Sequence, residues 1–123
     1  MKKILVVDDE PPLRFLFREM FGDKSKFETK EAANALDALK IFNEFKPDLL
    51  VLDVALPDMD GREILDQLKR EPHLEKCKVV LMSAIVDTEE AVLLSRVKVD
   101  IFLVKPFNIT EATQKIFALI GAA

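Results

Sequence analysis

Apolar and polar residues alternate along the chain with two different periods. Short apolar runs, such as residues 4–7, 49–52 and 101–104, are separated by longer segments in which apolar residues recur every three or four positions. Continuous apolar runs of this length are typical of strands buried on both faces of a sheet, and the longer period is typical of amphipathic helices. The pattern predicts an α/β protein with a parallel sheet, in which strand and helix alternate five times.

The boundaries of these elements follow from the runs and from residues that start helices. The expected strands span residues 3–7, 27–31, 49–52, 78–82 and 101–104, and the expected helices span 12–21, 35–45, 62–70, 88–97 and 109–120. Pro11 and Pro12 suit a first helical turn, and Asn34 and Asn108 suit helix N-caps. The second strand is short and mostly polar, so we expect it at an edge of the sheet.

The first predicted helix carries a large aromatic residue on its solvent side. Leu13, Leu16, Phe17 and Met20 repeat at helical spacing and define its expected buried stripe. At about 100° per residue, Phe15 points nearly opposite the centre of that stripe. We therefore expect the Phe15 ring to be exposed, although single exposed apolar residues are ordinary.

The composition fits one domain that spans residues 1–123. Half of the residues are hydrophobic, and a chain of this length supports one sizeable core without room for a second domain. The 22 Asp and Glu residues outnumber the 18 Lys and Arg residues, for a net charge of −4, and the sequence has no basic cluster. Direct binding to nucleic acid is therefore not expected.

The cysteine content and the N-terminal segment indicate a cytoplasmic protein. Cys77 has no second cysteine with which to form an internal disulfide, and it is expected as a half-buried filler rather than a reactive thiol. The apolar run after Lys3 is too short for a signal peptide or a membrane span. We expect a reducing compartment and no contact with a membrane.

Acidic residues follow two of the apolar runs. Asp8 and Asp9 come directly after the first run, and Asp53 comes after the run at 49–52. Each one alone would more often be a turn former or a helix cap. In an open parallel sheet, however, the carboxyl ends of the strands form the binding edge, so these carboxylates should converge. Because converging carboxylates repel one another unless a cation lies among them, the spacing predicts a Mg²⁺ site suited to phosphoryl chemistry.

Four motifs lie in order at the ends of separate apolar runs. They are Val7-Asp8-Asp9-Glu10, Asp53 followed by Leu56-Pro57-Asp58-Met59-Asp60-Gly61, Met82-Ser83-Ala84, and Lys105-Pro106-Phe107. With these motifs the chain resembles, over essentially its whole length, the receiver domains of bacterial two-component response regulators. The resemblance implies a flavodoxin-like, doubly wound (βα)5 three-layer sandwich with the parallel strand order 2-1-3-4-5.

The resemblance implies a set of metal ligands. Asp9 and Asp53 would bind Mg²⁺ directly, Asp8 would bind it partly through water, and the backbone carbonyl of Ala55 would complete the protein ligands. Ala55 and Ile85 stand at the positions that flank the phosphorylation site in the resembling proteins. Neither has a polar group that could orient an attacking water, so we expect slow loss of the phosphoryl group.

The resemblance also implies the phosphoryl chemistry. Asp53 is the expected phosphoacceptor and would form an acyl phosphate, while Lys105 and Ser83 would bind the phosphoryl oxygens. Ser83 and Phe102 stand at the switch positions, which change the partner-binding face through a shift between two packings. Residues 97–101 depart from the small Gly-Ala turn usual in the family, so we expect a stiffer loop before Phe102.

The implied partners are proteins. A histidine kinase or a histidine phosphotransfer protein would donate the phosphoryl group, and a downstream protein would bind the altered face. Phe15 would lie on the helix by which resembling domains dock on the helical bundle of the phosphodonor protein. The expected assembly is a monomer or a weak phosphorylation-dependent dimer, with no catalysis beyond phosphorylation and dephosphorylation of the chain itself.

Several loop residues have structural predictions. Asp58, Asp60 and Gly61 are expected to shape the loop and the start of the following helix, and Gly61 is expected to adopt a backbone conformation that a side chain opposes. His73 is expected at the surface rather than as a phosphate carrier. The Lys105–Pro106 peptide bond matches one that is cis in the resembling family.

The same residues bear on three other functions. A haloacid-dehalogenase-like phosphatase also uses an aspartate nucleophile and Mg²⁺, but it would need a second Asp two residues after Asp53, where Ala55 stands. A nucleotide-binding enzyme would need a Gly-rich loop, which Gly22, Gly61 and Gly121 cannot form. A receiver-shaped scaffold that binds partners without being phosphorylated stays open, and phosphate labelling separates it from a phosphoacceptor.

Overall fold

The computed structural model describes residues 1–84 and 97–122. Of the helix predicted at 88–97, only Val97 is among these residues, and Ile85 lies outside them. The strands are β1 (Lys2–Val7), β2 (Phe27–Ala32), β3 (Leu49–Asp53), β4 (Lys78–Ser83) and β5 (Ile101–Val104). The helices are α1 (Pro11–Met20), α2 (Ala35–Phe45), α3 (Gly61–Lys69), the 3₁₀ helix η1 (Pro72–Lys76) and α5 (Ile109–Ile120).

The strands form one parallel sheet in the order β2-β1-β3-β4-β5. This is the predicted order, and the polar strand β2 lies at an edge, as predicted. The register pairs Val7 with Leu52 and Asp53 with Met82, and it pairs Ser83 with Val104. Because the paired strands end together, the residues that follow β1, β3, β4 and β5 meet along one rim of the sheet.

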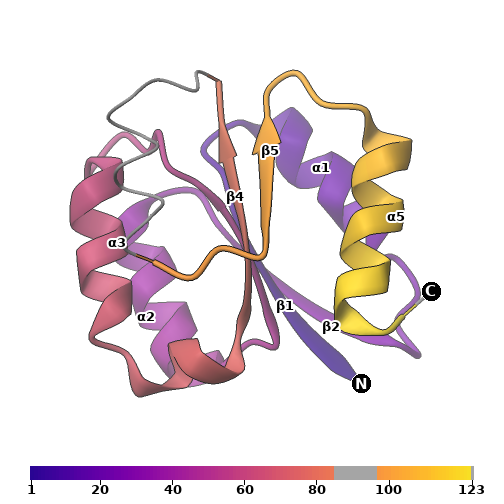
Figure 1. The fold of residues 1–123 in the computed structure, drawn as a ribbon, viewed down its shortest axis with the longest axis horizontal. Helices are drawn as coiled ribbons and strands as arrows, with labels where there is room; N and C mark the ends of the chain where they lie inside the picture. Colours follow the sequence, from indigo (N-terminus) through magenta and orange to yellow (C-terminus); the bar gives the residue numbers. More distant parts are fainter. Residues whose placement is uncertain (85–96, 123) are drawn as a thin grey trace.

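Helices cover both faces of the sheet, and alternate strand residues enter the two resulting cores (Figure 1). On one face, Leu5, Leu50 and Leu81 pack with α2 and α3. On the other face, Val51 and Val80 pack with α1 and α5. The side-chain period of two along a strand produces this division, so the predicted three-layer α/β sandwich is confirmed.

The predicted buried stripe of α1 is partly wrong. Phe17 is fully buried, but Leu16 is 39% exposed and lies on the flank of the helix. Arg14 takes the other flank, where its side chain is only 21% exposed and its guanidinium donates to the backbone carbonyl of Asp8. We attribute the orientation of α1 to this hydrogen bond. Because Arg14 and Leu16 lie on opposite flanks of the helix, a rotation that brings Arg14 toward the sheet moves Leu16 toward solvent. The prediction for Phe15 is confirmed, since its side chain is 52% exposed.

Side-chain caps hold the helix starts as the sequence predicted. Asn34 accepts a hydrogen bond from the backbone N–H of Asp37, and Asn108 accepts one from that of Glu111. Asp60 caps α3 in the same way through the N–H of Glu63. The Lys105–Pro106 peptide bond is cis, as predicted.

Gly61 is required for a different reason from the one predicted. Its φ is not positive, so the backbone conformation itself is open to other residues. A Cβ at Gly61 would instead lie 3.0 Å from both the Cβ and the carbonyl oxygen of Val54. Close packing of the start of α3 against the residue after Asp53 therefore disfavours a side chain at this position.

The prediction that His73 is a surface residue is also wrong. The His73 ring is partly buried, its Nε2 lies 2.6 Å from the carbonyl oxygen of Pro47, and the ring contacts Phe42 with 5.7 Å between centroids. His73 therefore connects η1 to the loop before β3.

Cys77 is more buried than expected, and burial raises the pKa of its thiol to about 12, which supports the prediction of a structural role. None of the described helices is long and apolar enough to cross a membrane.

Candidate functional site

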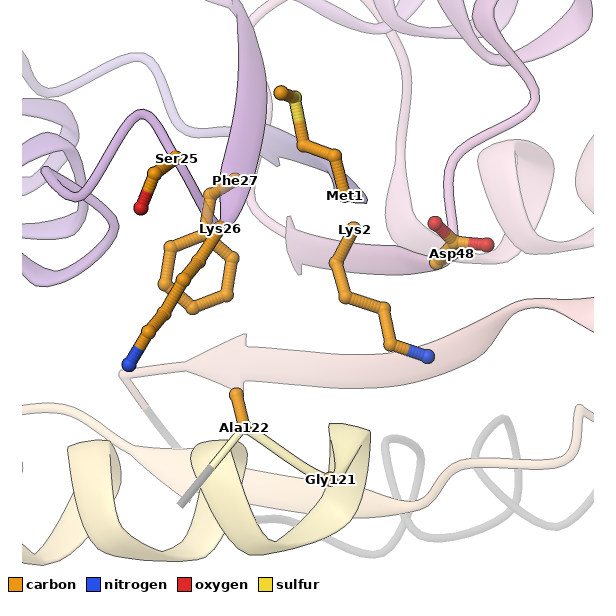
Figure 2. Close-up of a pocket in the computed structure, with 8 residues that line it drawn as sticks. All are labelled: Met1, Lys2, Ser25, Lys26, Phe27, Asp48, Gly121 and Ala122. Atoms are coloured by element: carbon orange, nitrogen blue, oxygen red, sulfur yellow. The ribbon is translucent and has the colours of Figure 1, made fainter.

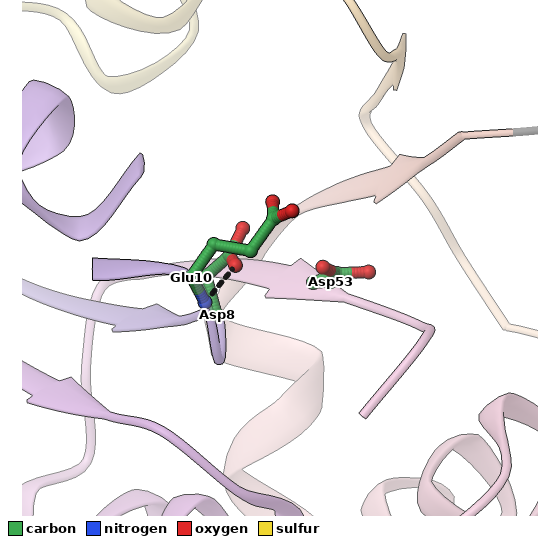
Figure 3. A group of neighbouring side chains, drawn as sticks. All are labelled: Asp8, Glu10 and Asp53. Atoms are coloured by element: carbon green, nitrogen blue, oxygen red, sulfur yellow. Dashed lines mark hydrogen bonds between the residues drawn. The ribbon is translucent and has the colours of Figure 1, made fainter. Parts of the chain in front are cut away.

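The rim at the carboxyl ends of the central strands carries a group of acidic side chains. Asp8 follows β1 and is fully buried, and Asp53 ends β3 and is 3% exposed. One carboxylate oxygen each from Asp8, Glu10 and Asp53 lie within 4.8 Å of one another. Figure 3 shows Asp8 and Glu10 at the end of β1 beside Asp53. Two buried carboxylates and one exposed carboxylate therefore share one small volume.

Lys105 supplies the positive charge at this rim. Its Nζ lies 2.7 Å from Asp53 Oδ2, 3.1 Å from Asp8 Oδ2 and 3.1 Å from Glu10 Oε2. Burial by itself would lower the pKa of Lys105, but the hydrogen bonds to Asp53 and Asp8 raise that pKa overall. The amine is therefore held in its charged form, positioned after β5 to contact the ends of β1 and β3.

Asp8 and Asp53 are held by the same local geometry. In each, Oδ1 accepts a backbone N–H from two residues further on, that of Glu10 at 2.8 Å and that of Ala55 at 2.8 Å. The other oxygen of each carboxylate accepts from Lys105. These turns fix the orientation of both carboxylates before any ligand binds. Burial raises the pKa of Asp8, although the Glu10 N–H and Lys105 both act to lower it.

Glu10 belongs to the acidic group, although sequence analysis did not single it out. Asp9 does not belong to it: its side chain is exposed, and its carboxylate is not among the oxygens that lie within 4.8 Å of one another. Asp8 Oδ1 accepts the backbone N–H of Glu10, and the tight turn that results places Glu10 over the rim. An Asp followed two residues later by Glu at the end of a buried strand is the signal that could have identified Glu10.

The two predicted switch residues lie on β4 and β5. Ser83 ends β4 and is 2% exposed, and its carbonyl accepts the N–H of Lys105 at 2.7 Å. Phe102 is partly buried against the core that contains α2 and α3. Asp100, just before β5, accepts the N–H of Val79 at 2.8 Å and donates its own N–H to the carbonyl of Val79. These bonds fix the start of β5 against β4, while the stiffness expected of the loop before Phe102 stays a prediction.

The rim has the chemistry of a site for a hard cation. Its candidate ligand atoms are carboxylate oxygens, and among the described residues three of these carboxylates surround Lys105 alone. Mg²⁺ is bound in proteins by one or two carboxylates together with water and phosphate oxygens. The residues present therefore fit Mg²⁺.

A hollow at the opposite end of the sheet has different chemistry. It has a volume of about 560 Å³ and lies beside the amino ends of β1 and β2 and the last residues after α5 (Figure 2). Its lining residues are Met1, Lys2, Ser25, Lys26, Phe27, Asp48, Gly121 and Ala122. Only one of these is acidic, and none belongs to the rim. The convergence of charged side chains therefore identifies the rim, rather than this hollow, as the candidate site.

Comparison with known proteins identifies the family. Residues 4–117 match the model of the response regulator receiver domain. The chain belongs to the response regulator receiver domain family. It is 37% identical to sporulation initiation phosphotransferase F of Bacillus subtilis over 110 residues, which cover 89% of this chain and 86% of that protein. It is 34% identical to chemotaxis protein CheY of Listeria monocytogenes over 119 residues, which cover 94% and 98% of the two chains.

Solved structures agree with this assignment at the level of fold. A CheY-like response regulator receiver domain protein from Methanospirillum hungatei superposes with a TM-score of 0.86 at 24% identity, covering 98% of this chain and 94% of that one. The receiver domain therefore functions in two-component phosphorelay signalling. Domains of this family typically act as phosphoacceptors rather than as enzymes.

Proposed function

We propose that Asp53 is the residue that accepts the phosphoryl group. The observation that carries this proposal is the contact of 2.7 Å between Asp53 Oδ2 and Lys105 Nζ at the end of a central strand. An Asp53 carboxylate oxygen would form a bond to phosphorus as the bond from phosphorus to the donor breaks, giving an acyl phosphate and the released donor group. Lys105, held in its charged form, would bind a phosphoryl oxygen in place of a carboxylate.

Mg²⁺ would be held by Asp8, Asp9, Asp53 and the backbone carbonyl of Ala55. Asp8 and Asp53 are already oriented for this by the turns described above. Asp9 lies beside Asp8 with an exposed side chain, and binding through Asp9 would bring its carboxylate to the rim. When bound, Mg²⁺ supplies charge neutralisation and alignment of the transferring phosphoryl group. Glu10, which bonds Lys105 at 3.1 Å, would hold the lysine over the rim until a phosphoryl group arrives.

Labelling with a small phosphodonor tests the assignment of Asp53. With Mg²⁺ and acetyl phosphate, the wild-type chain should gain one phosphoryl group that hydroxylamine removes, and Asp53→Asn should gain none. Asp48→Asn is the matched control, because Asp48 precedes the same strand at its other end and should leave labelling unchanged. Stoichiometric labelling of Asp53→Asn would overturn the assignment. Absence of labelling in the wild-type protein would instead favour a scaffold that acts without phosphorylation.

Ser83 and Phe102 would couple phosphorylation to partner binding. Ser83 ends β4 and is buried, and its backbone carbonyl accepts the N–H of Lys105, so the two residues are neighbours at the carboxyl ends of β4 and β5. Phe102 is only partly buried, so a further inward turn of its ring would bury more apolar surface. Ser83→Ala should leave labelling of Asp53 possible while weakening the change in partner binding that follows. Partner affinity measured with and without acetyl phosphate tests this coupling.

Phe15 would contact the histidine kinase or histidine phosphotransfer protein. Phe15 and Leu16 are 52% and 39% exposed, and both lie on α1, which begins just after the acidic rim. An exposed aromatic beside the site suits an apolar contact with a helical partner, and its truncation would cost about 1 to 3 kcal/mol of binding free energy. Phe15→Ala should slow phosphotransfer from the partner and leave acetyl phosphate labelling unchanged. Leu36→Ala on α2 is the control, because Leu36 is also a large exposed apolar residue, 66% exposed.

A further inference from the structure

Asp58 reaches from the loop after the phosphorylation site to the start of another helix. Its Oδ1 accepts the backbone N–H of Ala35 at 2.7 Å, and its Oδ2 accepts that of Leu36 at 3.0 Å. These residues begin α2, more than twenty positions earlier in the chain. Asn34, the N-cap of the same helix, accepts the N–H of Asp37 through its side chain. A distant side chain therefore satisfies two N–H groups that α2 itself leaves open.

The loop that carries Asp58 is anchored first at its beginning. Val54 donates its N–H to the carbonyl of Met82, Ala55 donates to Asp53, and Leu56 is 8% exposed. Close packing of Gly61 against Val54 then fixes the loop at its far end. Between these anchors, the exposed stretch from Pro57 onward is held to the body of the protein by Asp58.

The charge of Asp58 suits this role. A carboxylate is stabilised near the N-terminus of a helix, where the helix dipole is positive. The hydrogen bond from the Ala35 N–H lowers the pKa of Asp58 below its usual value, and the one from Leu36 adds to this, although burial acts to raise the pKa. Asp58 is directed to α2 and lies outside the acidic group on the rim. Its carboxylate thus binds helix N–H groups in place of a cation.

We propose that Asp58 is a positioning residue for the phosphorylation site. By holding the loop to α2, it fixes the peptide that contains Ala55, whose N–H orients Asp53 and whose carbonyl is a proposed ligand of Mg²⁺. This inference rests on the proposed function, because the metal role of the Ala55 carbonyl belongs to it. Asp58 would act through Ala55 and would not touch the phosphoryl group itself. Positioning partners of this kind typically change metal affinity by about tenfold or more when removed.

A comparison of two caps on the same helix tests the proposal. Asp58→Ala and Asn34→Ala each remove acceptors from the start of α2, so both should lower the melting temperature. Of these two residues, Asp58 is the one that bonds the loop to α2, so Asp58→Ala should weaken Mg²⁺ affinity about tenfold, whereas Asn34→Ala should leave it within about twofold of wild type. Calorimetric titration of the unphosphorylated proteins with Mg²⁺ measures this. Equal Mg²⁺ affinities in the two variants would show that Asp58 is only a helix cap, and would overturn the proposal.

Amide exchange in the metal-free proteins gives a second readout. The Ala55 N–H should exchange faster in Asp58→Ala than in wild type, and at the wild-type rate in Asn34→Ala, because only the first variant releases the loop. Unchanged exchange at Ala55 in Asp58→Ala would overturn the proposal. Asp58→Asn provides the same comparison if the alanine variant does not fold, since one amide oxygen can replace only one of the two acceptors. A wild-type protein that binds no Mg²⁺ but shows the predicted exchange would reject the proposed metal site and keep the positioning role.

Discussion

Two groups of charged side chains lie at neighbouring strand ends, and they are built in opposite ways. The rim group has three carboxylates around one lysine and consists of Asp8, Glu10, Asp53 and Lys105. The Glu31 group has one carboxylate between two arginines and consists of Glu31, Arg14 and Arg18. Arg18 binds Glu31 through two nitrogens, each at 2.7 Å. Carboxylates are in surplus in the first group and cations in the second.

The difference appears in the pKa shifts. Burial raises the pKa of Asp8 despite Lys105, whereas the hydrogen bond from Arg18 holds the pKa of Glu31 below its usual value. Ionised Asp8 therefore opposes folding, and ionised Glu31 favours it. The Glu31 group, in which cations are in surplus, joins α1 to the edge strand β2, whereas the rim group, in which carboxylates are in surplus, attracts a further cation. We infer that surplus buried charge, more than the number of acidic residues, marks the functional site.

The largest expected difference between the groups follows from removing a cation from each. Lys105→Ala leaves buried Asp8 and Asp53 without their common partner, so it should destabilise the metal-free protein by about 3 kcal/mol. Arg18→Ala removes an exposed partner, and Arg14 still contacts Glu31, so its cost should be much smaller than that of Lys105→Ala. Urea denaturation of both variants in the absence of metal measures these costs. Equal losses would remove the distinction between the two groups.

Added Mg²⁺ should act on one group alone. Because Mg²⁺ would bind the folded rim, a concentration one hundred times its Kd should stabilise the wild-type protein by about 2.7 kcal/mol. Asp8→Asn should lose most of this gain, and Arg18→Ala should keep it. Thermal unfolding with Mg²⁺ and with EDTA measures the gain in each protein. A full gain in Asp8→Asn would mean that the ion binds elsewhere.

The smallest effect should come from acidification of the Glu31 group. Glu31→Gln should cost about 0.5 to 1 kcal/mol at pH 7. The pKa of Glu31 is lowered from its reference value of 4.5 in the folded state, so its stabilisation is present above that value and is lost as the pH falls through the folded pKa. The stabilities of wild type and variant should therefore converge as the pH falls below the folded pKa of Glu31. A difference that persists once Glu31 is protonated would show that Glu31 acts by packing rather than by charge.

Most of the fold could be predicted from local patterns. Buried strands appear as continuous apolar runs, and Asn34 and Asn108 act on N–H groups only three residues away. The rim was also predictable, because parallel strands bring Asp8, Asp53 and Lys105 to one edge regardless of the details of packing.

The features that were missed depend on contacts between distant segments. Leu16 is exposed because α1 turns Arg14 toward Asp8, and Asp58 caps a helix that begins more than twenty residues earlier. Gly61 is needed because Val54 packs against it, which no local conformational rule predicts. His73 is partly buried for a similar reason, since its partner Pro47 lies 26 positions away. Helical periodicity cannot supply any of these contacts.

The hollow at the amino ends of the strands has a practical consequence for engineering the protein. Met1 and Ala122 line the same hollow, so the two ends of the described chain lie near each other and far from the acidic rim (Figure 2). A short flexible linker could therefore join residues 1 and 122, and new ends could be opened in the exposed turn at Lys24. Such a circular permutant would keep β1 and β3 adjacent. A fluorescent reporter attached at the hollow would likewise leave the acidic rim accessible to partner proteins.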